Sequence, residues 1–192
     1  MPGPYNQGMS SHIIISHYQA EALVRARRLG ETQVRTSVDL NLTMTLGELT
    51  DEGLALADGR GVLWAAIEAA AVIKTGCFLV EGDALEKIQT FSEGTGRAIT
   101  LYPTPGAPTI LISGVPMHRI KGSNPYQDTL TKIRAIAPLS GRVLDTATGL
   151  GYTACQASRV AGRVVTIELD PAVMEMARLN PWSKELFESA KI

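Results

Sequence analysis

The sequence predicts a mixed α/β protein in two parts: an N-terminal α+β domain with antiparallel hairpins, followed by the βαβα opening of a parallel, doubly wound sheet. Three observations support this fold class. Turn-forming clusters recur at 51–53, 58–61, 81–83 and 93–96, with short apolar or alternating segments between them. The hydrophobic period changes after about Gly122. From there, helix-start signals alternate with short β-branched segments, so we place the domains at 12–120 and 121–192.

The first part is expected to contain two helices among short strands. Residues 18–29 are rich in Ala, Leu and Arg, and Gly30 follows as a helix C-cap. The apolar segment 63–71 predicts the second helix. Alternation of apolar and polar residues predicts a half-buried strand over 34–42, and further strands are expected at 77–80, 98–101 and 109–112.

In the second part, each helix is expected to follow a recognisable start. Ser123 or Asn124 can cap a helix whose first residue is Pro125 and which runs to about 137. A strand over 142–145, a glycine-containing loop and a helix over 152–160 come next. A second strand, 164–167, then leads to a helix capped by Asp170, with Pro171 at its first position.

Composition narrows the class of protein. The 192 residues are 45% hydrophobic, which excludes wholesale disorder, and 18 Lys+Arg against 19 Asp+Glu leave no basic excess to indicate a nucleic-acid binder. Residues 1–11 are expected to be a disordered lead-in. The most apolar window, 62–80, contains Glu68 and Lys74, which favours a core helix and strand over a membrane span. Cys77 and Cys155 are not in a CxxC spacing, so we expect reduced thiols, no metal site and a cytoplasmic location.

The segment that indicates chemistry runs from Val143 to Ala154. Gly149 and Gly151 follow a strand, and glycine lets a backbone turn sharply and approach a ligand without a Cβ clash. Glu168 lies at the end of the next strand, where a carboxylate can accept hydrogen bonds from the vicinal hydroxyls of a ribose. This pattern predicts a ribose-containing cofactor at the strand ends.

Two cofactor classes fit the glycines. Residues 149–154 satisfy G-x-G-x-x-A, the dinucleotide fingerprint, so an NAD-binding protein is one alternative. However, the strand ends in an acid, Asp145, and Thr146, Ala147 and Thr148 precede the first glycine. A carboxylate there would repel a pyrophosphate but suits the ammonium and sulfonium of S-adenosylmethionine.

With Asp145, Gly149 and Gly151 followed by Glu168, the sequence resembles motifs I and II of the class I S-adenosylmethionine-dependent methyltransferases. More closely, the run from 116–119 to 180–183 resembles uncharacterised, mainly prokaryotic predicted methyltransferases related to spermidine synthases. The resemblance implies a Rossmann-like sheet, with the first three residues along the methionine side of the cofactor and Glu168 on its ribose. The candidate cofactor-binding residues are Asp145, Thr146, Ala147, Gly149, Gly151, Glu168 and Leu169.

The expected function is therefore methyl transfer from S-adenosylmethionine to an unknown acceptor, with no catalytic residue assigned. Aminopropyl transfer is a variant of this hypothesis. The chain stops where a third strand is expected, so we interpret it as a fragment. The alternative is that a partner completes the sheet. The alternative from another class is a non-catalytic binding or dimerisation module with a vestigial cofactor fold, and homo-oligomerisation stays open.

Overall fold

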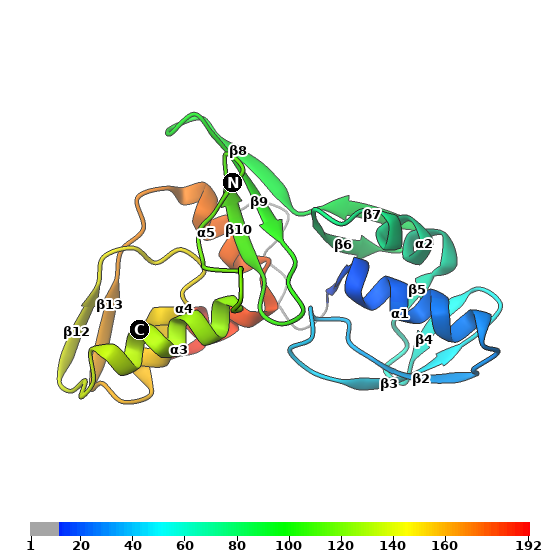
Figure 1. Cartoon of the computed structure of the whole chain (residues 1–192), viewed down its shortest axis with the longest axis horizontal. Coiled ribbons are helices and arrows are strands. Elements are labelled where there is room, and N and C mark those ends of the chain that lie inside the picture. Colours follow the sequence, from blue (N-terminus) through cyan, green and yellow to red (C-terminus); the bar gives the residue numbers. More distant parts are fainter. Residues whose placement is uncertain (1–11) are drawn as a thin grey trace.

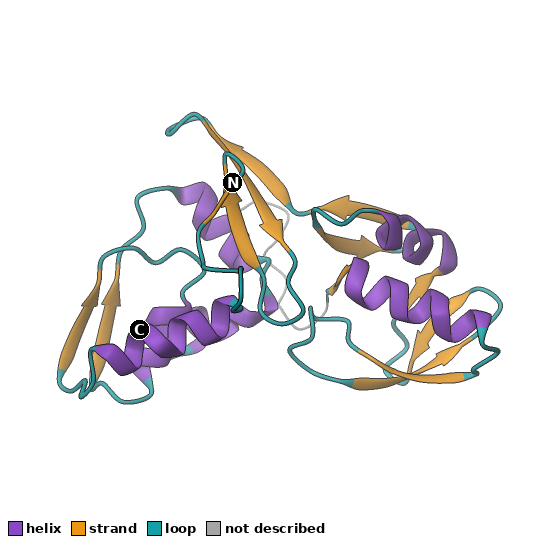
Figure 2. Ribbon diagram, viewed as in Figure 1, coloured by secondary structure: helices purple, strands orange, loops and turns teal. Residues whose placement is uncertain are grey.

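The computed structural model describes residues 12–192 as a mixed α/β structure, and the lead-in expected over 1–11 lies outside these residues. Within them the chain forms six α-helices and four β-sheets. Figure 1 shows one part, with β1–β7, α1 and α2, beside another that holds the remaining elements. The same view coloured by secondary structure shows helices packed against strands in both parts (Figure 2).

The first part holds two antiparallel sheets. One has the strand order β1-β6-β7 and the other β2-β3-β4-β5. Ser16 and Gln19 form a capping box that begins α1, which explains why the helix starts directly after β1. The elements are β1 (Ile13–Ser16), α1 (His17–Arg28), β2 (Gln33–Thr36), β3 (Thr45–Leu49), β4 (Gly53–Leu56), β5 (Gly61–Leu63), α2 (Trp64–Val72), β6 (Cys77–Glu81) and β7 (Ala84–Lys87).

A third antiparallel sheet lies between this part and the C-terminal helices (Figure 1). Its strand order is β11-β10-β9-β8, and the turn between β8 and β9 is the expected turn at 93–96. The strands are β8 (Gln89–Ser92), β9 (Arg97–Tyr102), β10 (Thr109–Ile112) and β11 (Val115–Pro116).

The C-terminal part contains a parallel βαβ unit. Strand β12 (Arg142–Asp145) pairs with β13 (Arg163–Thr166) in parallel, with Asp145 opposite Thr166, and α4 (Tyr152–Ser158) connects them. Before this unit comes α3 (Pro125–Ala135), and after it come α5 (Pro171–Arg178), the 3-10 helix η1 (Pro181–Ser183) and α6 (Lys184–Glu188). The expected starts are confirmed, because Asn124 caps α3 and Asp170 caps α5.

The face of the β12–β13 pair that carries Val143 and Val164 packs into the protein, and the opposite face is open. Leu144 and its cross-strand partner Val165 are 60% and 41% exposed. The Lys191 carbonyl accepts a hydrogen bond from the Val164 amide at 2.7 Å, so the last residues run beside one edge of β13.

Two hydrophobic cores hold the fold together. The second core fills the first part, among α1, α2 and its two sheets, and includes Ile13, Ile15, Trp64, Ile67, Phe78 and Val80. The first core lies mainly in the rest of the chain, but takes residues from β1 and β6 as well; it includes Ile14, Leu79, Ile99, Leu101, Ile110, Leu150, Tyr152, Val164, Met176 and Leu186. Side chains from both sides of residue 120 therefore pack in one core.

Most expected elements are confirmed, but the strand expected over 34–42 is wrong beyond Thr36. β2 ends at Thr36, and Leu40 and Asn41 have left-handed φ angles of 56° and 65°. The Ser37 hydroxyl accepts hydrogen bonds from the Asp39 and Asn41 amides, and these local bonds turn the backbone out of the strand. Leu40 is still buried, but polar Ser37 is buried as well and Leu42 is 40% exposed, so the alternation in sequence does not match the burial beyond Thr36.

Two further expectations concern membranes and cysteines. No helix among residues 12–192 has both the length and the apolar character needed to cross a bilayer. The 62–80 window forms α2 and β6, as expected. Cys77 and Cys155 are both buried and both free, which confirms reduced thiols in place of a disulfide.

Candidate functional site

The candidate cofactor residues lie at the carboxyl ends of the two parallel strands. β12 ends at Asp145, and β13 ends at Thr166 beside it. The Ile167 amide donates to the Asp145 carbonyl at 3.0 Å, and the Thr148 amide donates to the Ile167 carbonyl at 2.9 Å. These bonds extend the strand pairing into the loops and bring the 145–151 loop against the 167–169 segment.

The loop after β12 needs glycine at two positions. Gly149 and Gly151 have φ angles of 54° and 73°, in the left-handed region that residues with a Cβ rarely adopt. A Cβ on Gly149 would lie 2.5 Å from the Met117 side chain, and one on Gly151 would lie 2.6 Å from that of Leu186. The sharp turn therefore depends on both backbone conformation and close packing beneath the loop.

Leu150, between these glycines, anchors the loop to the protein. Its side chain is fully buried, and its carbonyl accepts a hydrogen bond from the Ser183 hydroxyl at 2.7 Å. Asn180 is also fully buried and donates to both Ser183 and Tyr152. A buried polar network thus holds the glycine loop in place.

Glu168 contacts the glycine loop directly. Its Oε2 accepts a hydrogen bond from the Gly149 amide at 2.8 Å, and its Oε1 accepts from the amides of Leu169 and Asp170 at 2.9 and 3.1 Å. A carboxylate has about four acceptor positions, so this side chain retains capacity for a hydroxyl donor. Its orientation is fixed by backbone amides alone.

Asp145 is held by a short chain of hydroxyl groups. Thr166 Oγ1 donates to Asp145 Oδ2 at 3.0 Å. The same Thr166 oxygen lies 2.7 Å from Thr148 Oγ1, and because the Thr166 proton is given to Asp145, Thr148 is the donor in that second bond. Neither Asp145 nor Glu168 forms an ion pair with any residue in 12–192, so two uncompensated carboxylates lie at this edge of the sheet.

The structure brings the seven predicted residues onto two adjacent loops. Asp145 and Glu168 are half-buried, and Gly149 and Gly151 are buried. The remaining three, Thr146, Ala147 and Leu169, are exposed, and Leu169 is 87% exposed. The arrangement is a partly open acidic site with a glycine-lined floor.

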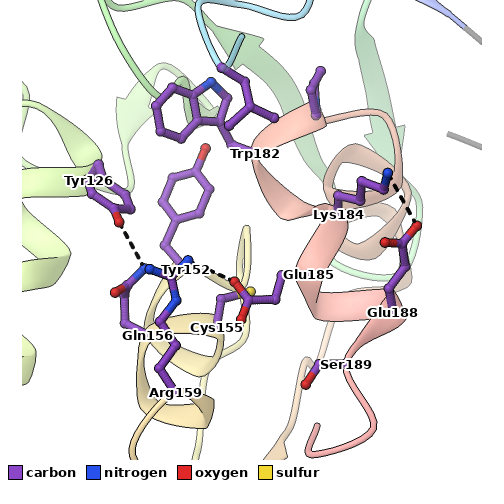
Figure 3. A pocket seen from close by; sticks show the side chains of 12 residues that line it. Tyr126, Tyr152, Cys155, Gln156, Arg159, Trp182, Lys184, Glu185, Glu188 and Ser189 are labelled. Atoms are coloured by element: carbon purple, nitrogen blue, oxygen red, sulfur yellow. Dashed lines mark hydrogen bonds and ion pairs between the residues drawn. The ribbon is translucent and has the colours of Figure 1, made fainter. Parts of the chain in front are cut away.

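A separate groove of about 600 Å³ lies over α4, between α3 and α6. Figure 3 shows Tyr126 bonded to Gln156, and Arg159 paired with Glu185 at 3.0 Å, along its walls. The Tyr126 and Trp182 rings lie 5.7 Å apart, centre to centre. None of the seven candidate residues is among those that line it: Leu42, Tyr126, Tyr152, Cys155, Gln156, Arg159, Pro181, Trp182, Lys184, Glu185, Glu188 and Ser189.

The groove contains no reactive thiolate. Burial, with a smaller contribution from the Glu185 charge, raises the pKa of Cys155 to about 12, so its thiol stays protonated near neutral pH. Burial likewise raises the pKa of the Tyr152 hydroxyl, which donates to the Pro108 carbonyl at 2.9 Å. Polar side chains that line this groove bond to neighbouring helices, as in Arg159 with Glu185, and to loops, as in Tyr152 with Pro108.

Sequence reasoning missed the residues that support the site. Asn180 donates to the Tyr152 hydroxyl, and the Trp182 Nε1 donates to the Leu40 carbonyl at 3.0 Å, whereas the sequence assigned neither residue a role in the site. His118, which the sequence did not indicate either, is half-buried, and its Nδ1 lies 2.9 Å from Thr109 Oγ1. The sequence signal that could have indicated a buried role for Asn180 is its position among apolar residues, next to Pro181 and Trp182.

No family model matches the chain. The Uncharacterized protein MJ1233 of Methanocaldococcus jannaschii is 55% identical over 112 residues, which are 58% of this chain and 37% of that relative. The chain thus spans little more than a third of the length of a relative whose description states no activity.

Proposed function

We propose that this chain is the cofactor-binding portion of an S-adenosylmethionine-dependent methyltransferase, built on the start of a Rossmann-like sheet. The observation that carries the proposal is the placement of Asp145, at the end of β12, and Glu168, just after its paired strand β13, beside the left-handed Gly149–Gly151 turn. This order of strand, acid, glycine loop, helix, strand and acid is the one on which the sequence resemblance rests.

The chemistry of the donor set fits the cofactor. Two carboxylates without a cationic partner in residues 12–192 favour a ligand with positive charge, and S-adenosylmethionine carries an ammonium and a sulfonium. Glu168 keeps acceptor capacity for ribose hydroxyls, and its fixed orientation limits the conformational entropy lost on binding. A pyrophosphate would instead approach Asp145 against charge repulsion, which disfavours the dinucleotide alternative.

In this proposal the described residues bind and orient the cofactor. Asp145 would face its amino group, Glu168 its ribose, and the loop through Gly149 would let the backbone approach its methionine portion. When bound, the sulfonium supplies an activated methyl group, and catalysis consists mainly of holding an acceptor in line with it. No residue of this chain is assigned as a base, and the acceptor is unassigned.

Calorimetric titration of the chain with S-adenosylmethionine and, separately, with NAD tests this proposal. We expect saturable heat with the first ligand only. The Glu168→Gln variant loses the charged acceptor and should bind S-adenosylmethionine about 1–3 kcal/mol more weakly, or roughly 5–150-fold.

The matched control is Glu175→Gln, which removes an exposed glutamate on α5 outside the site. Its affinity should equal that of the wild type. Binding of NAD without S-adenosylmethionine, or an unchanged affinity in Glu168→Gln, would contradict the proposal.

A further inference from the structure

The turn of the β8–β9 hairpin binds the residue that caps α5. Ser92 Oγ donates to Asp170 Oδ1 at 2.9 Å, and Thr95 Oγ1 donates to Asp170 Oδ2 at 2.7 Å. Ser92 and Asp170 are only 5% and 7% exposed. Helix α5 packs against both β8 and β9, and Figure 1 shows it beside this sheet.

The hairpin turn that makes this contact is itself well defined. The Thr95 amide donates to Ser92 Oγ at 3.3 Å, and the Gly96 amide donates to the Ser92 carbonyl at 2.8 Å. Gly96 adopts a left-handed φ of 66°, as this tight turn requires. The two hydroxyls are thus presented to Asp170 from a fixed backbone.

Asp170 is connected in turn to the candidate cofactor site. Its amide donates to Glu168 Oε1 at 3.1 Å, and the other oxygen of Glu168 accepts from the Gly149 amide. A continuous series of hydrogen bonds therefore runs from Thr95 through Asp170 and Glu168 to the glycine loop.

The contact with the hairpin exceeds what a helix cap needs. Capping of α5 uses Asp170 Oδ1, which accepts from the Ala172 amide at 3.0 Å, whereas Oδ2 is bound by Thr95. The segment before Asp170 has little apolar anchorage, since Ile167 is 52% and Leu169 87% exposed. The backbone that carries Glu168 is thus held on one side by the backbone hydrogen bonds of Ile167 and on the other by the hydrogen bonds at Asp170.

We propose that the β8–β9 hairpin positions Glu168, with Thr95 and Ser92 acting through Asp170 as positioning residues. Its importance for cofactor binding rests on the function proposed above, but the positioning itself does not. The first 120 residues would then contribute to the cofactor site without contacting the ligand.

Amide hydrogen exchange at Gly149 reports this positioning without any ligand, because that amide is bound by Glu168. In Thr95→Val, which removes the donor and keeps the shape, we expect Gly149 exchange to accelerate about fivefold or more. Exchange at Leu101 and Ile110, on β9 and β10 of the sheet to which the hairpin belongs, should change by less than about twofold. Calorimetry of the same variant should show S-adenosylmethionine binding weakened by a similar factor.

Two further variants control for folding and for a general effect of the hairpin. Thr95→Ser keeps the hydroxyl and should exchange at Gly149 as the wild type does. Thr90→Val changes a threonine on β8 for which no side-chain hydrogen bond is found in residues 12–192, and it should also leave Gly149 unchanged.

The outcomes separate this inference from the proposed function. Unchanged exchange at Gly149 in Thr95→Val would overturn the positioning role. Equal acceleration at Gly149, Leu101 and Ile110 would overturn it as well, because that result indicates a general loss of stability. Selective acceleration at Gly149 supports the positioning role. If the wild type then bound no S-adenosylmethionine, the role would stand and the proposed function would fail.

Discussion

At the scale of single residues, His118 links the N-terminal sheet to the support of the glycine loop. Its ring lies 5.2 Å from that of Tyr152, and its Nδ1 contacts the Thr109 hydroxyl. Burial is the main cause that lowers the pKa of His118 to about 4; the Lys132 charge adds to this shift, and the Asp128 charge partly offsets it. The imidazole is therefore neutral in the folded protein near neutral pH.

This lowered pKa predicts a loss of stability in mild acid. Below its ordinary pKa of about 6.5, the unfolded chain binds a proton at His118 that the folded protein does not. The free energy of unfolding should therefore fall as the pH decreases from about 6.5 to 4, by up to roughly 3 kcal/mol from this residue. Urea denaturation across this range measures the effect.

The variant His118→Gln isolates this contribution. The pKa of His17 is also lowered, by burial and then by Lys74, so the wild type alone mixes two histidines. Subtracting the pH profile of the variant from that of the wild type removes the contributions of His17 and the carboxylates to the free energy of unfolding. Parallel profiles for the two proteins would show that His118 titrates alike in the folded and unfolded states.

Residues that act through neighbours in the chain could be predicted, and those that act through distant contacts could not. Asp145, Gly149 and Glu168 stand in one strand–loop–helix–strand pattern, and the structure places them at one sheet edge. Thr95 and Asp170 are 75 positions apart, and neither has a local pattern that indicates the other. Only the tertiary packing of α5 on the β8–β9 hairpin brings them together.

At the scale of elements, Asn180, in the turn between α5 and α6, connects η1 to α4. Asn180 caps η1 through the Trp182 amide, donates to Tyr152 on α4, and donates to Ser183. The Asn180 side chain that makes these contacts is fully buried. The turn is thus a junction rather than a simple linker.

Removing this junction should be costly. We expect Asn180→Ala to lower the free energy of unfolding by about 2–4 kcal/mol, since several buried polar groups lose a partner at once. Asn124→Ala, which removes the half-buried cap of α3, should cost only about 1 kcal/mol. Urea denaturation of both variants makes the comparison, and equal losses would show that the buried network adds nothing to a cap.

Elements were predictable where a start or turn signal was local. Proline at the first helical position marked α3 and α5, and glycine clusters marked the hairpin turns. The 37–42 segment misled because its sequence alternates apolar and polar residues, yet it leaves the β2–β3 ladder and forms only an isolated bridge, between Ile14 and Asp39. Side chains of Ser37 and Asp39 bind the local backbone and compete with the sheet.

At the scale of the whole molecule, the paired strands β1 and β6 lie between the two cores, and each face of the pair contributes side chains to one core. Ile13 and Ile15 point into the second core, while Ile14 between them belongs to the first. On β6, Phe78 and Leu79 divide in the same way. Such strands are apolar on both faces, so their sequence predicts that both faces are buried. It does not indicate which core each face contacts, and the sharing of the strands between two cores could therefore not be predicted.

This shared sheet predicts that both cores unfold together. Trp64 lies in the second core and Trp182 packs against the first, so each tryptophan reports on one core. In protein labelled with 5-fluorotryptophan, the two native ¹⁹F resonances should disappear at the same urea concentration, because loss of either core exposes one face of β1–β6. Different midpoints would instead mean that the core with the higher midpoint is stable after the other has unfolded.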